Sequence, residues 1–398
     1  MVKAVKILAF LVLCLFVSLG VVKDVWAVGG LSTSGQGERA ISMGGAFVAV
    51  ADDGSAVYYN PAGLTQIQGQ SAEAGVLFLQ TKIAHTNTSG TETSQHRGSV
   101  GPYLFLSMDK LRPFTFGLGV YAPFVRDSDF GSSSDPNFGD QSAFTMRKDY
   151  SPVIAYQINP KLSIGTGLII GEGKVKQRFS TGAGSPVVIC DEADGYGFGG
   201  TVGLLYKVKD NLKVGAVYRS RMDVKFKGQR ETISGAVTQQ DSKFNYHFPA
   251  SAAIGIAYEP TDKLTLAFDV DWTDWSYLYE VVSKFESAED STTTLDSEDT
   301  VDYRLGAEFK INSTTSMRLG YSYMQAAFPS QWILPCKPDA DNQAISLGLS
   351  KSLGNLKLGV MYEYLFTEDL DVDNNAYSFN GRYKVEQHTV GLKAAYAF

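Results

Sequence analysis

Most of the chain, from 71 to 398, is a long series of segments in which apolar and polar residues alternate. In one of them Leu356, Leu358 and Val360 fall on one face of a strand, and Lys357 falls on the other. Successive side chains of a β-strand point to opposite faces, so each segment has an apolar and a polar face. Many segments exceed the roughly five or six residues of a soluble strand and reach the roughly nine to eleven that cross a bilayer.

The connections between these segments alternate between short turns and long polar loops. Short turns stand at 109–112, 159–160, 209–210, 260–262, 312–314 and 353–354, and long loops at about 85–96, 124–143, 179–191, 228–241, 283–298, 327–341 and 367–383. This sorting is typical of a bacterial outer-membrane barrel, and a soluble sandwich has no reason to show it. Because the bilayer core offers no water to backbone groups, the sheet must close on itself.

The sequence therefore predicts an all-β membrane protein, an antiparallel transmembrane β-barrel of about 14 strands. The predicted strands lie near 71–86, 96–108, 113–124, 143–158, 161–179, 191–208, 211–228, 241–259, 262–282, 298–311, 315–326, 341–353, 355–367 and 383–398.

The part of the chain before the alternating region has a different pattern. Residues 34–64 are rich in Gly, Ala and Ser and show no period of two. A compact segment of this kind, placed before a barrel, can fill its lumen. We therefore expect residues 28–70 to form a small, partly helical hatch that plugs the barrel of residues 71–398.

Residues 1–27 have the features of a secretory signal peptide. Lys3 and Lys6 precede an apolar run over 7–22, and Val25-Trp26-Ala27 resembles a cleavage site. A retained membrane anchor is the alternative, although the run is short for a span of about 20 residues.

The last strand ends on an aromatic residue. Val390, Leu392, Ala394, Tyr396 and Phe398 share one face. This ending resembles the signal that the outer-membrane barrel-insertion machinery reads, so that machinery is an expected partner through Phe398.

Charge and histidine content argue against several functions. The formal net charge is −7, without the basic footprint that nucleic-acid binding needs. The four histidines, His85, His96, His247 and His388, have no partner at nucleophile or metal-ligand spacing. We therefore expect no enzyme, no catalytic residue, no metal, no cofactor and no nucleic-acid partner.

Two other sets of residues allow more than one interpretation. Cys190 and Cys336 both fall in long loops on the same side, so a disulfide between them is one hypothesis and two free thiols are the other. Arg219, Arg304 and Arg318 are expected to face the lumen, where they either pair with other charges and the hatch or receive a ligand carboxylate.

Several motifs, in order and at consistent spacing, carry a resemblance to a known family. They are Arg39-Ala40, Met43-Gly44-Gly45-Ala46, Ala51-Asp52-Asp53 and Tyr58-Tyr59-Asn60-Pro61-Ala62-Gly63-Leu64, with support from 116–123, 248–250, 303–306 and 317–321. With these motifs the chain resembles the FadL/TodX family of outer-membrane transporters for long-chain fatty acids and other hydrophobic compounds.

The resemblance implies a gating site. In that family the third strand kinks inward and opens a lateral gap toward the membrane, and the turn at Asn60–Gly63 would contact this kink. The third predicted strand contains Gly117 and Gly119 and ends at Pro123. Glycine marks bulges or close approach and proline cannot donate to the ladder, so these three are the expected kink residues. The alternative is that the glycines only relieve crowding inside the barrel.

The resemblance also implies a function. The chain would be a channel for diffusive uptake of a hydrophobic small molecule, with lateral release into the outer membrane gated by the hatch. Its other partners would be outer-membrane lipid and lipopolysaccharide, and it would be a monomer. The alternatives are a general porin and a surface adhesin-type barrel without a dedicated hydrophobic substrate.

Overall fold

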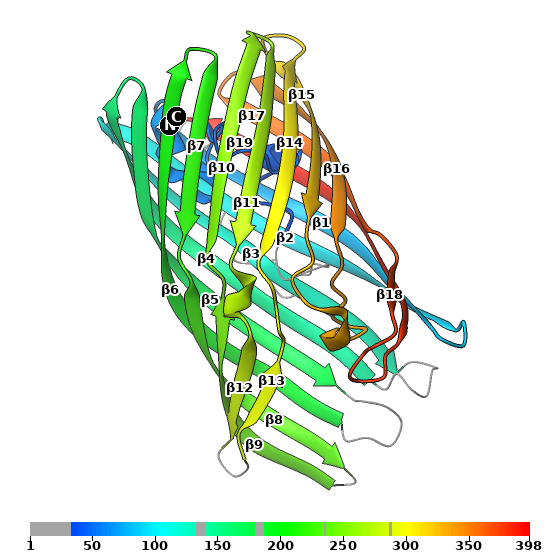
Figure 1. Ribbon diagram of the computed structural model, residues 1–398. Helices are drawn as coiled ribbons and strands as arrows, with labels where there is room; N and C mark the ends of the chain where they lie inside the picture. The colour runs from blue at the N-terminus through cyan, green and yellow to red at the C-terminus, as the bar shows by residue number, and fades with distance from the viewer. Residues whose placement is uncertain (1–32, 133–139, 180–186, 235, 286–288) are drawn as a thin grey trace.

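The computed structural model describes residues 33–132, 140–179, 187–234, 236–285 and 289–398, and the predicted signal peptide at 1–27 lies outside them. The chain forms a closed antiparallel β-barrel of 14 strands with the hatch inside it (Figure 1). Strand β1 (Gln70–Asn87) closes the barrel by pairing with β19 (Gly381–Ala397). The predicted fold class is confirmed.

The first half of the barrel wall consists of long, continuous strands. After β1 come β2 (Glu92–Leu111), β3 (Phe114–Ser132), β4 (Asp140–Asn159), β5 (Leu162–Phe179) and β6 (Val187–Lys209). They run past the predicted strand ends, and several predicted loops are shorter for that reason. The first of them, placed at 85–96 by the sequence, is a tight turn between Asn87 and Glu92.

Several strands of the second half are interrupted. The paired segments are β7 (Leu212–Arg219) with β8 (Met222–Ser234), β9 (Ala236–Phe248) with β10 (Ser251–Thr261), β11 (Leu264–Thr273) with β12 (Glu280–Phe285) across the 3-10 turn η2 (Trp275–Tyr277), and β13 (Ser291–Thr294) with β14 (Thr300–Lys310). At one break Pro249 has no N–H for the ladder. The sequence predicted each of the first three pairs as one uninterrupted strand.

The remaining wall elements are β15 (Thr315–Met324), the 3-10 turn η3 (Ser330–Trp332), β16 (Asn342–Leu353), β17 (Leu356–Thr367) and β18 (Leu370–Val372). Alternation along the strands sorts the side chains as predicted. In β19, for example, Val390 and Leu392 are exposed on the outer face, whereas Thr389 and Lys393 are buried toward the lumen.

The hatch consists of very short helices joined by turns. They are α2 (Glu38–Ile41), α3 (Ala56–Tyr59) and the 3-10 helix η1 (Pro61–Gln66). Gly44 and Gly45, just after α2, take positive φ angles of 66° and 78°, which glycine adopts without strain. In the described part of the chain, no helix combines the length and apolar character required to span a bilayer.

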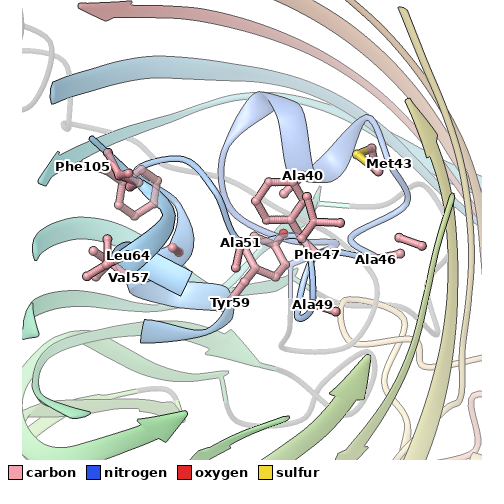
Figure 2. Close-up of a cluster of buried hydrophobic side chains, with 14 of the residues drawn as sticks. Ala40, Met43, Ala46, Phe47, Ala49, Ala51, Val57, Tyr59, Leu64 and Phe105 are labelled. Carbon is pink, nitrogen blue, oxygen red and sulfur yellow. The ribbon is translucent and has the colours of Figure 1, made fainter. Parts of the chain in front are cut away.

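The hatch packs against the inner wall through a buried apolar cluster (Figure 2). It contributes small residues such as Ala40 together with Met43, Phe47 and Leu64, and Phe105 of β2 meets them from the wall. The small side chains allow the hatch backbone to approach the wall closely.

Candidate functional site in the hatch and the barrel wall

The Asn60 side chain holds one turn of the hatch against the wall. It is fully buried, and its Oδ1 accepts a hydrogen bond from the Ala62 N–H at 3.1 Å. Its Nδ2 donates to the carbonyl of Val48 at 2.9 Å and to that of Leu204 in β6 at 3.0 Å. One amide therefore closes the turn, joins it to the rest of the hatch and fixes both to the wall.

Wall glycines form the seat for this turn. A Cβ atom at Gly203 of β6 would overlap Asn60 Oδ1, and one at Gly165 of β5 would overlap the backbone between Pro61 and Ala62. The turn therefore lies against β5 and β6, and the 3-10 helix η1 that follows it also contacts β3 and β4. The contact of the turn with a kink in the third strand, which the resemblance implied, stays a prediction. Within the hatch, Gly63 packs just as closely against the Ala51 carbonyl.

The ladder between the second and third strands stops part-way along both strands. Register pairs run from Leu111–Phe114 to Leu104–Val120, and beyond that point β3 pairs only with β4. Farther out, the Asp129 N–H donates to the Gln95 side chain at 2.6 Å and reconnects the two strands. The interval without a ladder covers about eight residues, or roughly 25 Å of strand.

The predicted kink residues occupy two different environments. Pro123 lies in the irregular part of β3, where the register to β4 shifts between Tyr121 and Phe124. Gly117 and Gly119 lie in the regular part, and a Cβ at either position would come within 2.8 Å of the Val57 side chain of the hatch. Both glycines leave room for hatch side chains, and the ladder to β2 ends just beyond them. Their part in a kink stays a prediction.

The first described residues of the hatch bind the irregular part of β3. The Thr33 N–H donates to the Pro123 carbonyl at 3.1 Å, and Gln36 Nε2 donates to the Ala122 carbonyl at 2.9 Å. These carbonyls lie where the ladder to β2 is missing, so residues 33–36 replace part of its hydrogen bonding. We call residues 33–36 the entry segment.

A cavity adjoins the entry segment and the ladder break. It is bounded by Gly101 and Pro102 of β2, by Ala122 and Val125 of β3, and on its far side by Trp275. Its volume is about 90 Å³, far below the roughly 300–1,000 Å³ of pockets that hold drug-sized ligands. The cavity as it stands is therefore too small to hold a ligand of that size.

The three arginines proposed for a ligand carboxylate all bind the hatch. Arg318 donates to Glu308 and Glu38, and Arg304 donates to Asp271 at 2.6 Å and to the hatch carbonyl of Ser34 at 2.7 Å. Each guanidinium thus has partners within the protein.

Arg219 differs because its hatch partners are neutral. It donates to the carbonyl of Tyr58, and its guanidinium lies 4.4 Å from the Tyr58 ring centroid. The structure therefore supports the first of the two interpretations for these arginines, that they pair within the protein and hold the hatch.

Arg39 forms the most direct ionic link between hatch and wall. Its Nε and Nη2 donate to the two oxygens of Glu308 in β14, both at 2.9 Å. Its Nη1 pairs with Asp52, and Lys393 of β19 lies 3.4 Å from Asp53. Burial alone would raise the pKa of the Asp53 carboxyl, but Lys393, Arg39 and a hydrogen bond from Ser55 hold that pKa well below its usual range.

Of the two cysteines in the disulfide hypothesis, the structure describes the side chain of Cys336 only. Cys336 carries a free, buried thiol that packs with Ile83, Phe379 and Val385 under the loops at the barrel mouth. The backbone of Cys190 belongs to β6, where it pairs in register with Gln177 of β5, although the sequence predicted a loop at this position. The sequence could not show which residues surround Cys336, because its neighbours come from segments far apart in the chain.

Sequence reasoning missed an arginine site in β4. The Arg147 guanidinium donates to both oxygens of Asp149 at 2.8 Å and lies 4.3 Å and 4.7 Å from the rings of Phe124 and Phe248. It supports the irregular part of β3 through Phe124. The rings come from strands far apart in sequence, so no local signal marks this set.

The model of one protein family, described as outer membrane protein transport protein (OMPP1/FadL/TodX), matches residues 23–398. The chain belongs to this family. It is therefore a bacterial outer-membrane protein of a transport family and not an enzyme.

Individual members of the FadL/TodX family are distant in sequence. The outer membrane protein P1 of Haemophilus influenzae is 24% identical over 398 residues, which cover 84% of each chain. A long-chain fatty acid transport protein of Salmonella typhi is 22% identical over 422 residues, which cover 92% of each chain.

Solved structures show the same fold. A Pseudomonas aeruginosa FadL homologue superposes with a TM-score of 0.81 at 18% identity, over 93% of this chain and 100% of that chain. The toluene transporter TodX of Pseudomonas putida gives 0.79 at 21% identity, over 93% and 100%. The barrel with an internal hatch is thus the fold of these FadL/TodX structures as well.

Proposed function

We propose that this protein takes up hydrophobic or amphipathic molecules, such as long-chain fatty acids, by diffusion and releases them sideways into the outer membrane. The exit is the ladder break between β2 and β3, and the entry segment gates it. The observation that carries the proposal is the coincidence of three features: a missing ladder, a cavity beside it, and hatch residues bonded to the β3 carbonyls at that level.

Lateral release has a physical advantage for such a substrate. An acyl chain that left the barrel axially would enter water, at a cost of about 0.8 kcal/mol for each exposed CH₂ group. Passage through the wall transfers it from an apolar lumen to apolar lipid. The cavity lining supports this path, since Leu77, Leu79 and Val125 lie toward the break.

The relatives support a hydrophobic substrate but differ in which one. The Salmonella protein is named for long-chain fatty acids and the Pseudomonas putida protein for toluene. A general porin is a weaker alternative because the hatch is packed into the lumen through a buried apolar core. Contact with outer-membrane lipid and lipopolysaccharide, insertion through Phe398, and a monomeric state belong to the same proposal.

A reversible cross-link across the break tests the exit. Gly101→Cys and Val125→Cys place thiols on the two strands beside the cavity, in a background with Cys190→Ser and Cys336→Ser. A short, cleavable bismaleimide should stop oleate and alkylbenzene uptake by cells, and cleavage should restore it. The control is Leu106→Cys with Leu118→Cys, which are register partners in the intact ladder. Uptake that continues at full rate through the linked break would rule out lateral release there.

The Asn60→Ala variant separately tests whether the seating of the hatch gates transport. The substitution removes three hydrogen bonds and leaves buried carbonyls of Val48 and Leu204 without this donor. We expect equal binding of oleate by purified protein but altered uptake. Unaltered uptake would show that the seating of this turn does not gate transport.

A further inference from the structure

Three lysines stand directly opposite one another on the outer face of adjacent strands. Lys227 of β8 pairs in register with Lys243 of β9, and Lys243 pairs with Lys284 of β12. All three side chains are exposed. Directly opposed residues share a face of the sheet, with Cβ atoms roughly 4.5–5.5 Å apart. The lysines thus form a short row across three strands, which we call the lysine row.

Carboxylates of the described residues lie beside the lysine row but form no ion pair with it. Among the described residues, none of its members forms an ion pair with a carboxylate. Asp194 of β6 lies opposite Lys227 in register. On the other side of Asp194 lies Lys174 of β5, which forms an ion pair with Glu192. This face carries two further exposed charges, Lys225 two residues along β8 and Asp241 two residues along β9.

Like charges in direct opposition destabilise a sheet. The chain as a whole is acidic, with a formal net charge of −7, so a general excess of lysine does not explain the row. An external anion with more than one negative group would relieve the repulsion.

The height of the lysine row on the barrel indicates which layer of the membrane the row faces. On β6 the outer face carries the exposed side chains of Phe198 and Tyr196, and Tyr196 pairs in register with Lys225. Aromatic girdles of this kind mark the membrane–water boundary. The row lies two residues farther out, or about 7 Å.

The same end of the barrel is the outer one. Strands β8, β9 and β12 project at the end opposite the C-terminus (Figure 1). The short turns lie at the C-terminal end, and in outer-membrane barrels the short turns are periplasmic. The lysine row therefore faces the headgroup layer of the outer leaflet.

We propose that the lysine row binds the phosphorylated saccharide headgroup of lipopolysaccharide. Each lysine ammonium is a point charge suited to a phosphate oxygen, and a row of three matches a headgroup that bears several phosphates. The site is outside the barrel and separate from the uptake path. Its consequence is that the protein holds a lipopolysaccharide molecule against the β8–β9–β12 sheet.

The test compares two triple variants that remove the same charge. The first is Lys227→Gln, Lys243→Gln and Lys284→Gln. The control is Lys161→Gln, Lys209→Gln and Lys351→Gln, three exposed lysines at or beside the periplasmic turns. Binding of purified deep-rough lipopolysaccharide to detergent-solubilised protein is measured by native mass spectrometry, with dephosphorylated lipopolysaccharide and phosphatidylglycerol as competing probes.

We expect the first variant to bind lipopolysaccharide on the order of 100-fold more weakly, because each lysine near an anionic surface contributes a factor of about five. The control variant should bind like the wild type. Dephosphorylated lipopolysaccharide and phosphatidylglycerol should compete poorly. Equal loss in both variants, equal binding of either competing probe, or undiminished binding by the first variant would each overturn the proposal.

Thermal unfolding provides a second readout that does not depend on affinity. Without lipopolysaccharide the first variant should melt no lower than the wild type, since glutamine removes the repulsion between opposed ammonium groups. Added lipopolysaccharide should raise the melting temperature of the wild type and of the control variant, but not that of the first variant. A variant that melts lower without lipopolysaccharide would show that the lysines serve the fold instead.

Discussion

Arg39 provides a quantitative test of how the hatch is held. It crosses from hatch to wall with two hydrogen bonds of 2.9 Å to Glu308, and 7% of its surface is exposed. Hydrogen bonds to charged groups contribute about 1.5–3 kcal/mol each. Glu308 keeps Arg318 as a partner after Arg39 is lost, so we discount the sum to about 3 kcal/mol for Arg39→Met. That corresponds to an increase of roughly 100-fold in the population with a released hatch.

The assay is the labelling rate of a buried hatch cysteine. Position 56 is fully buried in α3, and Ala56→Cys combined with Cys190→Ser and Cys336→Ser leaves one thiol in residues 28–398. When opening is fast and labelling slow, the maleimide rate is proportional to the open population. We expect about a 100-fold increase for Arg39→Met and a smaller one for Arg39→Lys, which keeps the charge but loses the two-pronged geometry.

The matched control is Arg147→Met. Arg147 is equally buried, with 6% of its surface exposed, and also donates twice to one carboxylate, but its partner is within β4. Its loss should change the labelling rate by less than about threefold, since no hatch contact is removed. Equal acceleration by both variants would mean general loosening of the barrel, and no acceleration by Arg39→Met would refute the ionic anchor.

Three further outcomes follow from the structure. Gly203→Ala should lower the temperature at which the barrel loses its heat-resistant gel mobility, because the added Cβ overlaps Asn60. Gly200→Ala on the same strand is the control and should be tolerated, since its Cβ meets only a backbone oxygen at 3.5 Å. Equal behaviour of the two variants would contradict the seating of the Asn60 turn on Gly203. Because the pKa of Asp53 is depressed in the folded state, its contribution is present above the unfolded pKa of about 3.9 and is lost as pH falls below it. Pepsin cleavage of the hatch should therefore rise below about pH 4, less steeply in Asp53→Asn, and identical profiles would exclude this role. Burial raises the pKa of the Cys336 thiol, so it should resist maleimide in the native protein and react after unfolding; rapid native labelling would contradict its burial.

The barrel and its hatch were predictable because their signals are local. A period of two over many residues specifies a strand with one apolar face, and the sorted loop lengths specify a closed membrane sheet. The absence of that period before residue 70 distinguished the hatch from the barrel in the sequence. The Asn60–Gly63 motif likewise identified a hatch turn that the structure shows to be buried.

The partners across the lumen could not be predicted, because they depend on which strands face each other once the sheet has closed. Asn60 donates a hydrogen bond to the Leu204 carbonyl of β6, and Arg304 donates to Asp271 and to the Ser34 carbonyl. Cys336 is buried in a cluster with Ile83, Phe379 and Val385, which come from distant parts of the chain.

The ladder break and the lysine row could not be predicted from the sequence for the same reason. A hydrogen-bond ladder is a property of two strands, and so is a charge repulsion across them. Pro123 signalled irregularity, but only the register shows where β2 and β3 part. The sequence alone determined a closed barrel filled by a hatch, and the tertiary structure decided where that barrel is held shut and where its wall is unpaired.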